Sequence, residues 1–144
     1  MGFQKEEYLR ALVQRTKRLV GTHEVILLTS NKEWTNNQDD YSGYSVKSEF
    51  FSDDDEEKIL NTLYKIGFAV RQFCNEEDFL AFVSTEQQSL SNKIVVNSAQ
   101  KGTKIGRKSL IPAVCDLYGI PYVGSDPYVV SLCRDKYRCS CILA

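Results

Sequence analysis

The hydrophobic pattern begins as a helix and then changes to short apolar runs. Apolar positions within residues 4–19 recur three or four residues apart, which predicts an amphipathic helix. Gly21 follows as its C-terminal stop. Residues 24–29 form an apolar run of strand length, which is typical of a strand covered on both faces. Residues 31–44 are polar and without period, and they predict a loop.

Capped helices alternate with strands in the rest of the chain. Ser52 and the acidic run 53–57 predict the solvated start of a helix that ends at Gly67. Its inner stripe is expected at Ile59, Leu60, Leu63 and Ile66. The pattern then predicts a strand at 68–73, a helix at 75–83, a polar link at 84–92, a strand at 93–97, a helix at 109–118, a short edge strand before Gly124, and a last helix capped by Ser125 or Asp126.

This alternation predicts the α/β class. We expect a Rossmann-like open parallel sheet of about four strands, with helices on both faces and right-handed crossovers. Ligands of such sheets bind beyond the carboxyl ends of the strands. The candidate surface is therefore formed by the loops that follow Thr29, Phe73, Ser98 and Gly124.

Composition and charge exclude several classes of function. The 144 residues, 42% of them hydrophobic, suffice for the core of a single domain. A net charge of −1 gives no general attraction to nucleic acid or to anionic membranes. The charged N-terminus is no secretory signal, and no apolar run approaches the ~20 residues that span a bilayer. We therefore expect a cytoplasmic protein without nucleic-acid or membrane partners.

The cysteines and the histidine point to neither metal nor nucleophilic chemistry. Five cysteines in a chain without an export signal are expected to be reduced thiols. The spacing of Cys133, Cys139 and Cys141 matches no standard zinc pattern, so no metal is expected. His23 has no partner in a triad order, and the sequence predicts no catalytic residue.

The loop after the third strand is the candidate for ligand chemistry. Residues 97–109 contain two glycines, four basic residues and the start of a helix. Backbone amides at a helix start, with Arg107 and Lys108 beside them, suit a carboxylate or a phosphate. The loop is neither a Walker loop nor a dinucleotide-binding turn, and a solvated basic loop without a ligand is the alternative.

Taken together, residues 97–136 resemble the D-alanine–D-alanine ligase family of ATP-grasp enzymes. The residues that carry the resemblance are Asn97, Gly102, Arg107, Pro112, Ala113, Asp116, Gly119, Ile120, Pro121, Tyr122, Gly124, Ser125, Asp126, Asp135 and Lys136. Residues 49–70 also look like the second unit of the first domain of that family. The resemblance implies that residues 1–134 form a Rossmann-like domain and that residues 135–144 begin an ATP-grasp module that is missing from this chain.

Full-length members of that family use ATP and magnesium to make an acyl phosphate from a carboxylate, which an amine then attacks. The resemblance implies that Lys136 contacts the nucleotide phosphates and that the loop faces a small carboxylate substrate. The substrate-binding candidates are Asn97, Gln100, Gly102, Gly106, Arg107 and Lys108. The chain alone is expected to bind neither ATP nor magnesium and to be inactive, as the non-catalytic, substrate-side domain of a carboxylate–amine ligase.

Two departures from the family affect the substrate. Gly106-Arg-Lys-Ser109 stands where the family has Gly-Glu-Asp-Gly, and Gln100-Lys101 replaces its histidine-glycine pair. This reversal from acid to base predicts a carboxylate other than D-alanine, such as a peptide or an amino acid with an acidic group of its own.

The alternative function is a non-catalytic doubly wound module that binds a ligand or another protein. For either function, the domain border is expected to expose apolar surface and to self-associate. The apolar residues at this border are Val129, Val130, Leu132 and Ile142.

Overall fold

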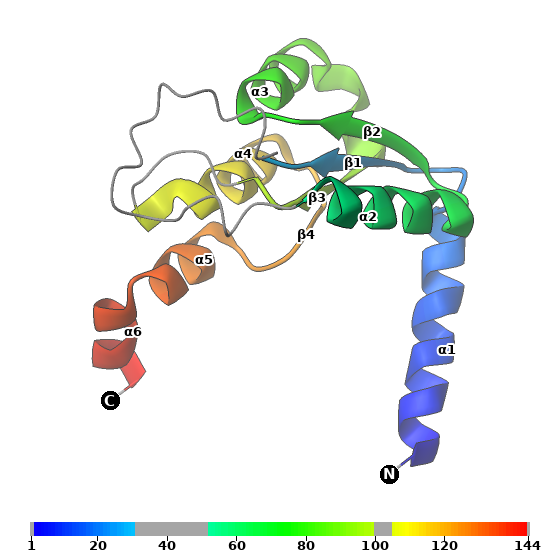
Figure 1. Cartoon of the computed structure of the whole chain (residues 1–144), viewed down its shortest axis with the longest axis horizontal. Helices are drawn as coiled ribbons and strands as arrows, with labels where there is room; N and C mark the ends of the chain where they lie inside the picture. The colour runs from blue at the N-terminus through cyan, green and yellow to red at the C-terminus, as the bar shows by residue number, and fades with distance from the viewer. Residues whose placement is uncertain (1, 31–51, 100–104, 144) are drawn as a thin grey trace.

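A computed structural model describes residues 2–30, 52–99 and 105–143 of the chain. Four strands form one parallel sheet in the order β2-β1-β3-β4 (Figure 1). Their bounds are β1 Glu24–Leu28, β2 Ala69–Phe73, β3 Lys93–Asn97 and β4 Tyr122–Val123. The predicted α/β fold, with a Rossmann-like sheet, is therefore confirmed.

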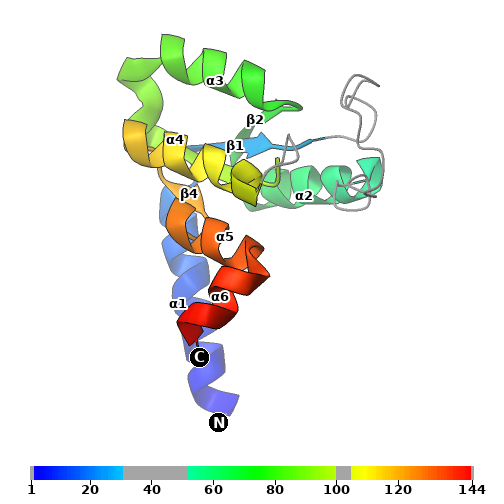
Figure 2. The same ribbon diagram turned by 90° about the vertical axis from the view of Figure 1, so that its left-hand side faces the viewer.

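Helices lie on both faces of this sheet, as Figures 1 and 2 show. The α-helices are α1 Gly2–Leu19, α2 Asp53–Ile66, α3 Glu76–Thr85, α4 Leu110–Tyr118, α5 Pro127–Arg134 and α6 Lys136–Leu143. Two 3-10 segments, η2 Gln87–Asn92 and η3 Ile105–Ser109, precede β3 and α4. The polar link expected at 84–92 is thus mostly helical, and the loop expected at 31–44 lies outside the described residues.

Local capping explains where several helices begin and end. The Ser52 hydroxyl accepts a hydrogen bond from the Asp55 backbone amide, and the Asp55 carboxylate accepts one from the Ser52 amide. Gly67 ends the helix at φ 104°, a left-handed conformation that favours glycine. Ile66 is 44% exposed, so its predicted place on the inner stripe is wrong, because the helix ends there and the chain turns into β2.

The main core fills one face of the sheet. Alternate residues of β1 and β3, Ile26, Leu28 and Val95, point to this face and are completely buried. They pack against side chains of α3, α4 and the segments that flank them: Phe79, Phe82, Val83, Leu90, Ala99, Ile111, Cys115 and Ile120. Helix α2 packs against the opposite face, near β2. None of the helices that the structure describes is both long and apolar enough to cross a membrane.

A charged group joins three strands at the amino edge of the sheet. The Glu24 carboxylate accepts a hydrogen bond of 2.6 Å from Lys93 Nζ on β3 and one of 3.0 Å from Arg71 Nε on β2. Burial alone would raise the pKa of Glu24, but the hydrogen bonds and charges of Lys93 and Arg71 outweigh it, so the pKa lies below its ordinary value. The Arg71 guanidinium also lies 4.8 Å from the centre of the Phe82 ring.

Replacement of Glu24 by glutamine is expected to lower the free energy of unfolding by about 1–3 kcal/mol near neutral pH, because Lys93 would lose its carboxylate in a buried position. Since the folded-state pKa of Glu24 is lowered, this stabilisation is present above the ordinary value of 4.5 and is lost as the pH falls through the folded value. Urea unfolding of the wild type and of Glu24→Gln, at neutral and at acidic pH, measures this stabilisation. Glu57→Gln is the control, because Glu57 is exposed on α2. An equal loss at both pH values for Glu24→Gln would contradict this account.

Candidate functional site

The order of the strands locates the candidate site at the carboxyl ends of β1 and β3. From β1 the chain crosses to β2 on one side, and from β3 it crosses to β4 on the other. The strand order reverses between the two central strands, and open α/β sheets bind ligands at this point. Thr29 and Ser98 follow the two strands directly, and the Ser98 amide donates a hydrogen bond of 2.9 Å to the Leu28 carbonyl. The sheet thus holds the two strand ends side by side.

Asn97 ends β3 and offers a hydrogen-bond donor at this edge. Its Oδ1 accepts a hydrogen bond of 3.0 Å from the Ala99 amide, which fixes the side chain in a local turn. Its Nδ2 makes no hydrogen bond within the described part of the chain, although the residue is half-buried. An amide donor that is held in place and left without an acceptor suits a carboxylate oxygen.

The basic residues of the predicted loop lie in η3, just before α4. Arg107 and Lys108 are half-buried, Gly106 is exposed, and the Gly106 carbonyl accepts a hydrogen bond of 2.6 Å from the Ser109 hydroxyl. Gln100 and Gly102, the other two candidates of the loop, lie outside the described residues. The structure therefore describes four of the six substrate-binding candidates, Asn97, Gly106, Arg107 and Lys108.

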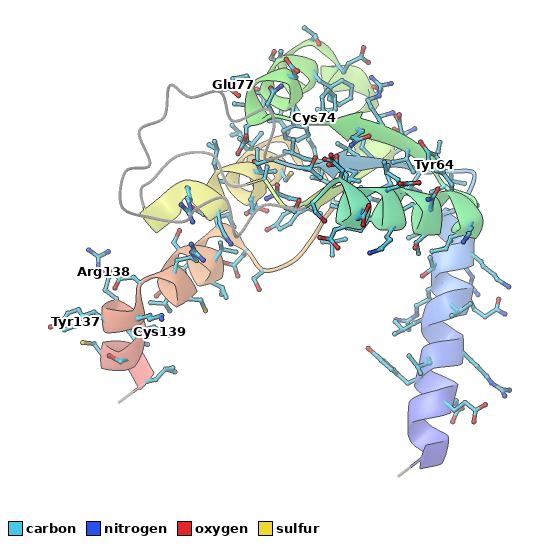
Figure 3. The ribbon with its side chains drawn as sticks, viewed as in Figure 1. Tyr64, Cys74, Glu77, Tyr137, Arg138 and Cys139 are labelled. Atoms are coloured by element: carbon cyan, nitrogen blue, oxygen red, sulfur yellow. The ribbon has the colours of Figure 1, made fainter. Side chains whose placement is uncertain are left out.

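Lys136 opens the last helix, at the break between α5 and α6. Asp135 separates the two helices, and its carboxylate accepts a hydrogen bond of 3.0 Å from the Arg138 amide. A cavity of about 580 Å³ lies between η3, α5 and α6, and the Lys136 side chain is not part of its lining. The lining residues are Gly106, Tyr128, Ser131, Leu132, Asp135, Tyr137, Arg138, Cys141 and Ile142. Figure 3 shows Tyr137, Arg138 and Cys139 together on α6.

A buried polar network that the sequence analysis missed lies at the same edge, on the face that α2 covers. The Thr29 hydroxyl, which is completely buried, donates a hydrogen bond of 2.7 Å to Glu56 Oε1, and Gln72 Nε2 donates to the same oxygen. Glu56 is only 5% exposed, so the prediction that the run 53–57 is wholly solvated is wrong for this residue. In the described residues, no lysine or arginine nitrogen forms an ion pair with the Glu56 carboxylate.

The position of Glu56 in the helical repeat explains its burial. Glu56 precedes Ile59, Leu60 and Leu63 by three, four and seven residues, so all four share one helix face. That spacing was visible in the sequence and could have identified Glu56 as an inward-facing acid. The two donors that the structure shows at this carboxyl group, Thr29 and Gln72, are both neutral, and burying an acidic group without an opposite charge costs stability.

The cysteines lie apart from this chemistry. All five are free thiols, as predicted. Burial, with the nearby charges of Glu56 and Asp78, raises the pKa of Cys74, and burial raises that of Cys115 to about 12. Both thiols therefore stay protonated and are poor nucleophiles at neutral pH. Within the ranges that the structure describes, no three side chains of the types that bind metals lie together.

Comparison with known proteins gives one partial match. The chain is 34% identical over 80 residues to a protein named D-alanine–D-alanine ligase from Thermotoga petrophila. The match covers 56% of this chain and 25% of that ligase, so the chain spans about a quarter of the length of the relative that it matches. No protein-family model and no solved structure matches the chain. The match supports a ligase-like relationship.

Replacement of Thr29 by valine is expected to lower the free energy of unfolding by about 1.5–3 kcal/mol, because a buried carboxylate would lose one of its two donors while the shape of the side chain is kept. Urea unfolding measures the loss. Ser84→Ala removes an exposed hydroxyl that donates to a helix carbonyl, and this control should change stability little. A Thr29→Val protein as stable as the wild type would show that the network contributes nothing.

Proposed function

We propose that this chain is the substrate-side domain of an ATP-dependent carboxylate–amine ligase similar to D-alanine–D-alanine ligase. The partial identity to such a ligase supports the class of enzyme. The observation that supports the role of the domain is Asn97, whose amide donor has no acceptor among the described residues and lies where the strand order reverses. The domain binds and orients a carboxylate and performs no chemistry alone.

The binding groups divide into a neutral donor and positive charge. Asn97 Nδ2 donates to one oxygen of the carboxylate. Arg107 and Lys108, which lie after β3 and before α4, supply the positive charge that attracts the anion. The positive charge of this segment favours a substrate with a second acidic group over neutral D-alanine. The candidates Gln100, Gly102 and Gly106 complete the loop in this proposal.

The nucleotide side of the reaction belongs to another part of the whole protein. In the described ranges, metal-ligating side chains do not gather in threes, so these residues do not fit a magnesium site. ATP and magnesium would be held by an ATP-grasp module, with Lys136 reaching the phosphates from the border. The break at Asp135, between α5 and α6, supports a domain of residues 1–134 and a module that begins at 135.

The second candidate is a doubly wound protein-interaction domain. The observation that favours it is the exposed apolar face of α1, which includes Tyr8 and Val13. Binding of a small carboxylate gives this apolar face no role. The two functions differ in their ligands, since the ligase domain binds small carboxylates and the interaction domain does not.

Titration of the chain with D-glutamate, glutarate and D-alanine tests the proposal, with amide NMR shifts and calorimetry as readouts. The dicarboxylates are expected to shift the Asn97 and Arg107 amides and to bind at least tenfold more tightly than D-alanine. Asn97→Asp keeps the acceptor for Ala99 but removes the donor, and it should weaken binding at least tenfold, or about 1.4 kcal/mol.

Asn61→Asp is the matched control, because it makes the same change on exposed α2 and should leave binding unchanged. Tighter binding of D-alanine, through the same amides, would overturn the preference for a second acidic group. An absence of shifts with every carboxylate would contradict the ligase proposal and favour the interaction domain.

A further inference from the structure

Helix α1 stands away from the rest of the molecule. Figures 1 and 2 show it extending from the sheet, with the N-terminus at its far end. Its 18 residues make it about 27 Å long at 1.5 Å per residue. It meets the body at its base, where Leu19 and Val20 are half-buried and Val20 lies close to Gly67. Packing against the body therefore does not account for the apolar residues farther along the helix.

One face of this helix is apolar and exposed. Tyr8 is 64% exposed, Leu9 50%, Leu12 38% and Val13 53%. The pairs 8 and 12, and 9 and 13, are each one helical turn apart, so the four side chains form one surface. Four large apolar side chains in a continuous exposed stripe are typical of a surface that binds another molecule.

The charges beside this stripe differ between the two halves of the helix. Glu6 and Lys17 are three turns apart and both flank the stripe next to Val13, at 3.6 residues per turn. Both acidic residues, Glu6 and Glu7, lie in the first half together with Lys5 and Arg10, and Arg10 pairs with Glu6 along the same helix, whereas the second half carries only the basic residues Arg15, Lys17 and Arg18. A partner helix that runs in the opposite direction and carries the same sequence would place acid beside base at both ends.

We propose that α1 pairs with α1 of a second copy of this chain, antiparallel and around a two-fold axis. With the axis between Ala11 and Leu12, Glu6 of each copy faces Lys17 of the other, and Tyr8 faces Arg15. The leucines at 9 and 12 cover each other across the axis. A parallel pair would align like charges, and an anionic lipid surface, which would attract the basic residues of α1, would repel Glu6 beside the stripe.

The size of the surface sets the strength of the association. A pair of helices of this length buries less than the roughly 1,200–2,000 Å² of a standard stable interface. The dimer is therefore concentration-dependent, with a dissociation constant in the micromolar range. This inference goes beyond the proposed function and does not rest on it, because α1 precedes the sheet and contributes none of the carboxylate-binding candidates.

Sedimentation velocity of the whole chain over a wide concentration range tests the proposal. The wild type is expected to pass from monomer to dimer, and Leu12→Asp should weaken the association at least tenfold. Because α1 contacts the described part of the body only at its base, the midpoint of thermal unfolding of the body should stay the same. Circular dichroism checks that the helix remains. A wild type that stays monomeric throughout would overturn the proposal.

A charge exchange tests the direction of the pair. Glu6→Lys and Lys17→Glu are each expected to weaken the dimer about threefold or more, since each places like charges face to face. The double variant places opposite charges together again and should recover most of the wild-type affinity. Failure of the double variant to recover, with helix content unchanged, would overturn the antiparallel arrangement.

Tyr137→Asp distinguishes this surface from the border surface of α5 and α6. Tyr137 is 78% exposed on α6, and Val129 on α5 and Ile142 on α6, where the sequence predicted self-association, are exposed too. The variant should dimerise like the wild type. If Tyr137→Asp loses the dimer and Leu12→Asp keeps it, the association belongs to the border surface. If the monomer binds anionic vesicles and Leu12→Asp abolishes this binding, α1 is a membrane-surface helix. Either result overturns the proposal.

Discussion

The rest of the structure depends on the burial of β1. The side chains of Val25 to Leu28 are at most 3% exposed, and the strand pairs in parallel with β2 on one side and β3 on the other. A strand buried in this way requires cover on both faces, which α2 supplies on one and α3 and α4 supply on the other. Crossovers long enough to return each strand in parallel then account for the order of the helices along the chain.

Each end of β1 carries a group of buried or half-buried polar side chains. At the amino end, Glu24 joins Lys93 and Arg71, and each charge has a partner of opposite sign. At the carboxyl end, the neutral donors Thr29 and Gln72 donate to the buried Glu56 carboxylate, which pairs with no lysine or arginine that the structure describes. The first group stabilises the sheet, whereas the second costs more to maintain and holds the first turn of α2 against the edge where ligands of such folds bind.

The relation to the ligase rests on a partial match. The identity to the Thermotoga ligase covers a quarter of that protein, so it supports a part of an enzyme and leaves the whole activity as a proposal. What the described residues add is chemical: an amide donor at Asn97 and basic residues in η3, with Glu56 nearby on the other face. These groups support the proposal that the domain positions an anion, and in that proposal the phosphoryl chemistry belongs to another part of the protein.

Local interactions made much of the fold predictable from the sequence alone. Helix starts at Ser52 and Asp126 and the helix end at Gly67 depend on hydrogen bonds and backbone angles within a few residues, so the residue types announce them. The apolar runs predicted the strands, because a run of apolar residues is likewise a local feature of the sequence. Asn97 could be placed at the end of the third strand and Arg107 and Lys108 after it, and their role in binding stays a prediction.

Contacts between distant residues were decided by the tertiary structure. Thr29 and Glu56 are 27 residues apart, Glu24 and Arg71 47, and Glu24 and Lys93 69, so no local pattern pairs them. The amphipathic pattern of α1 predicted a helix with an apolar face, but only the fold leaves that face uncovered. Sequence determined which segments become helices and strands, because those depend on neighbours, and the packed sheet determined which charges are buried and which apolar faces remain exposed.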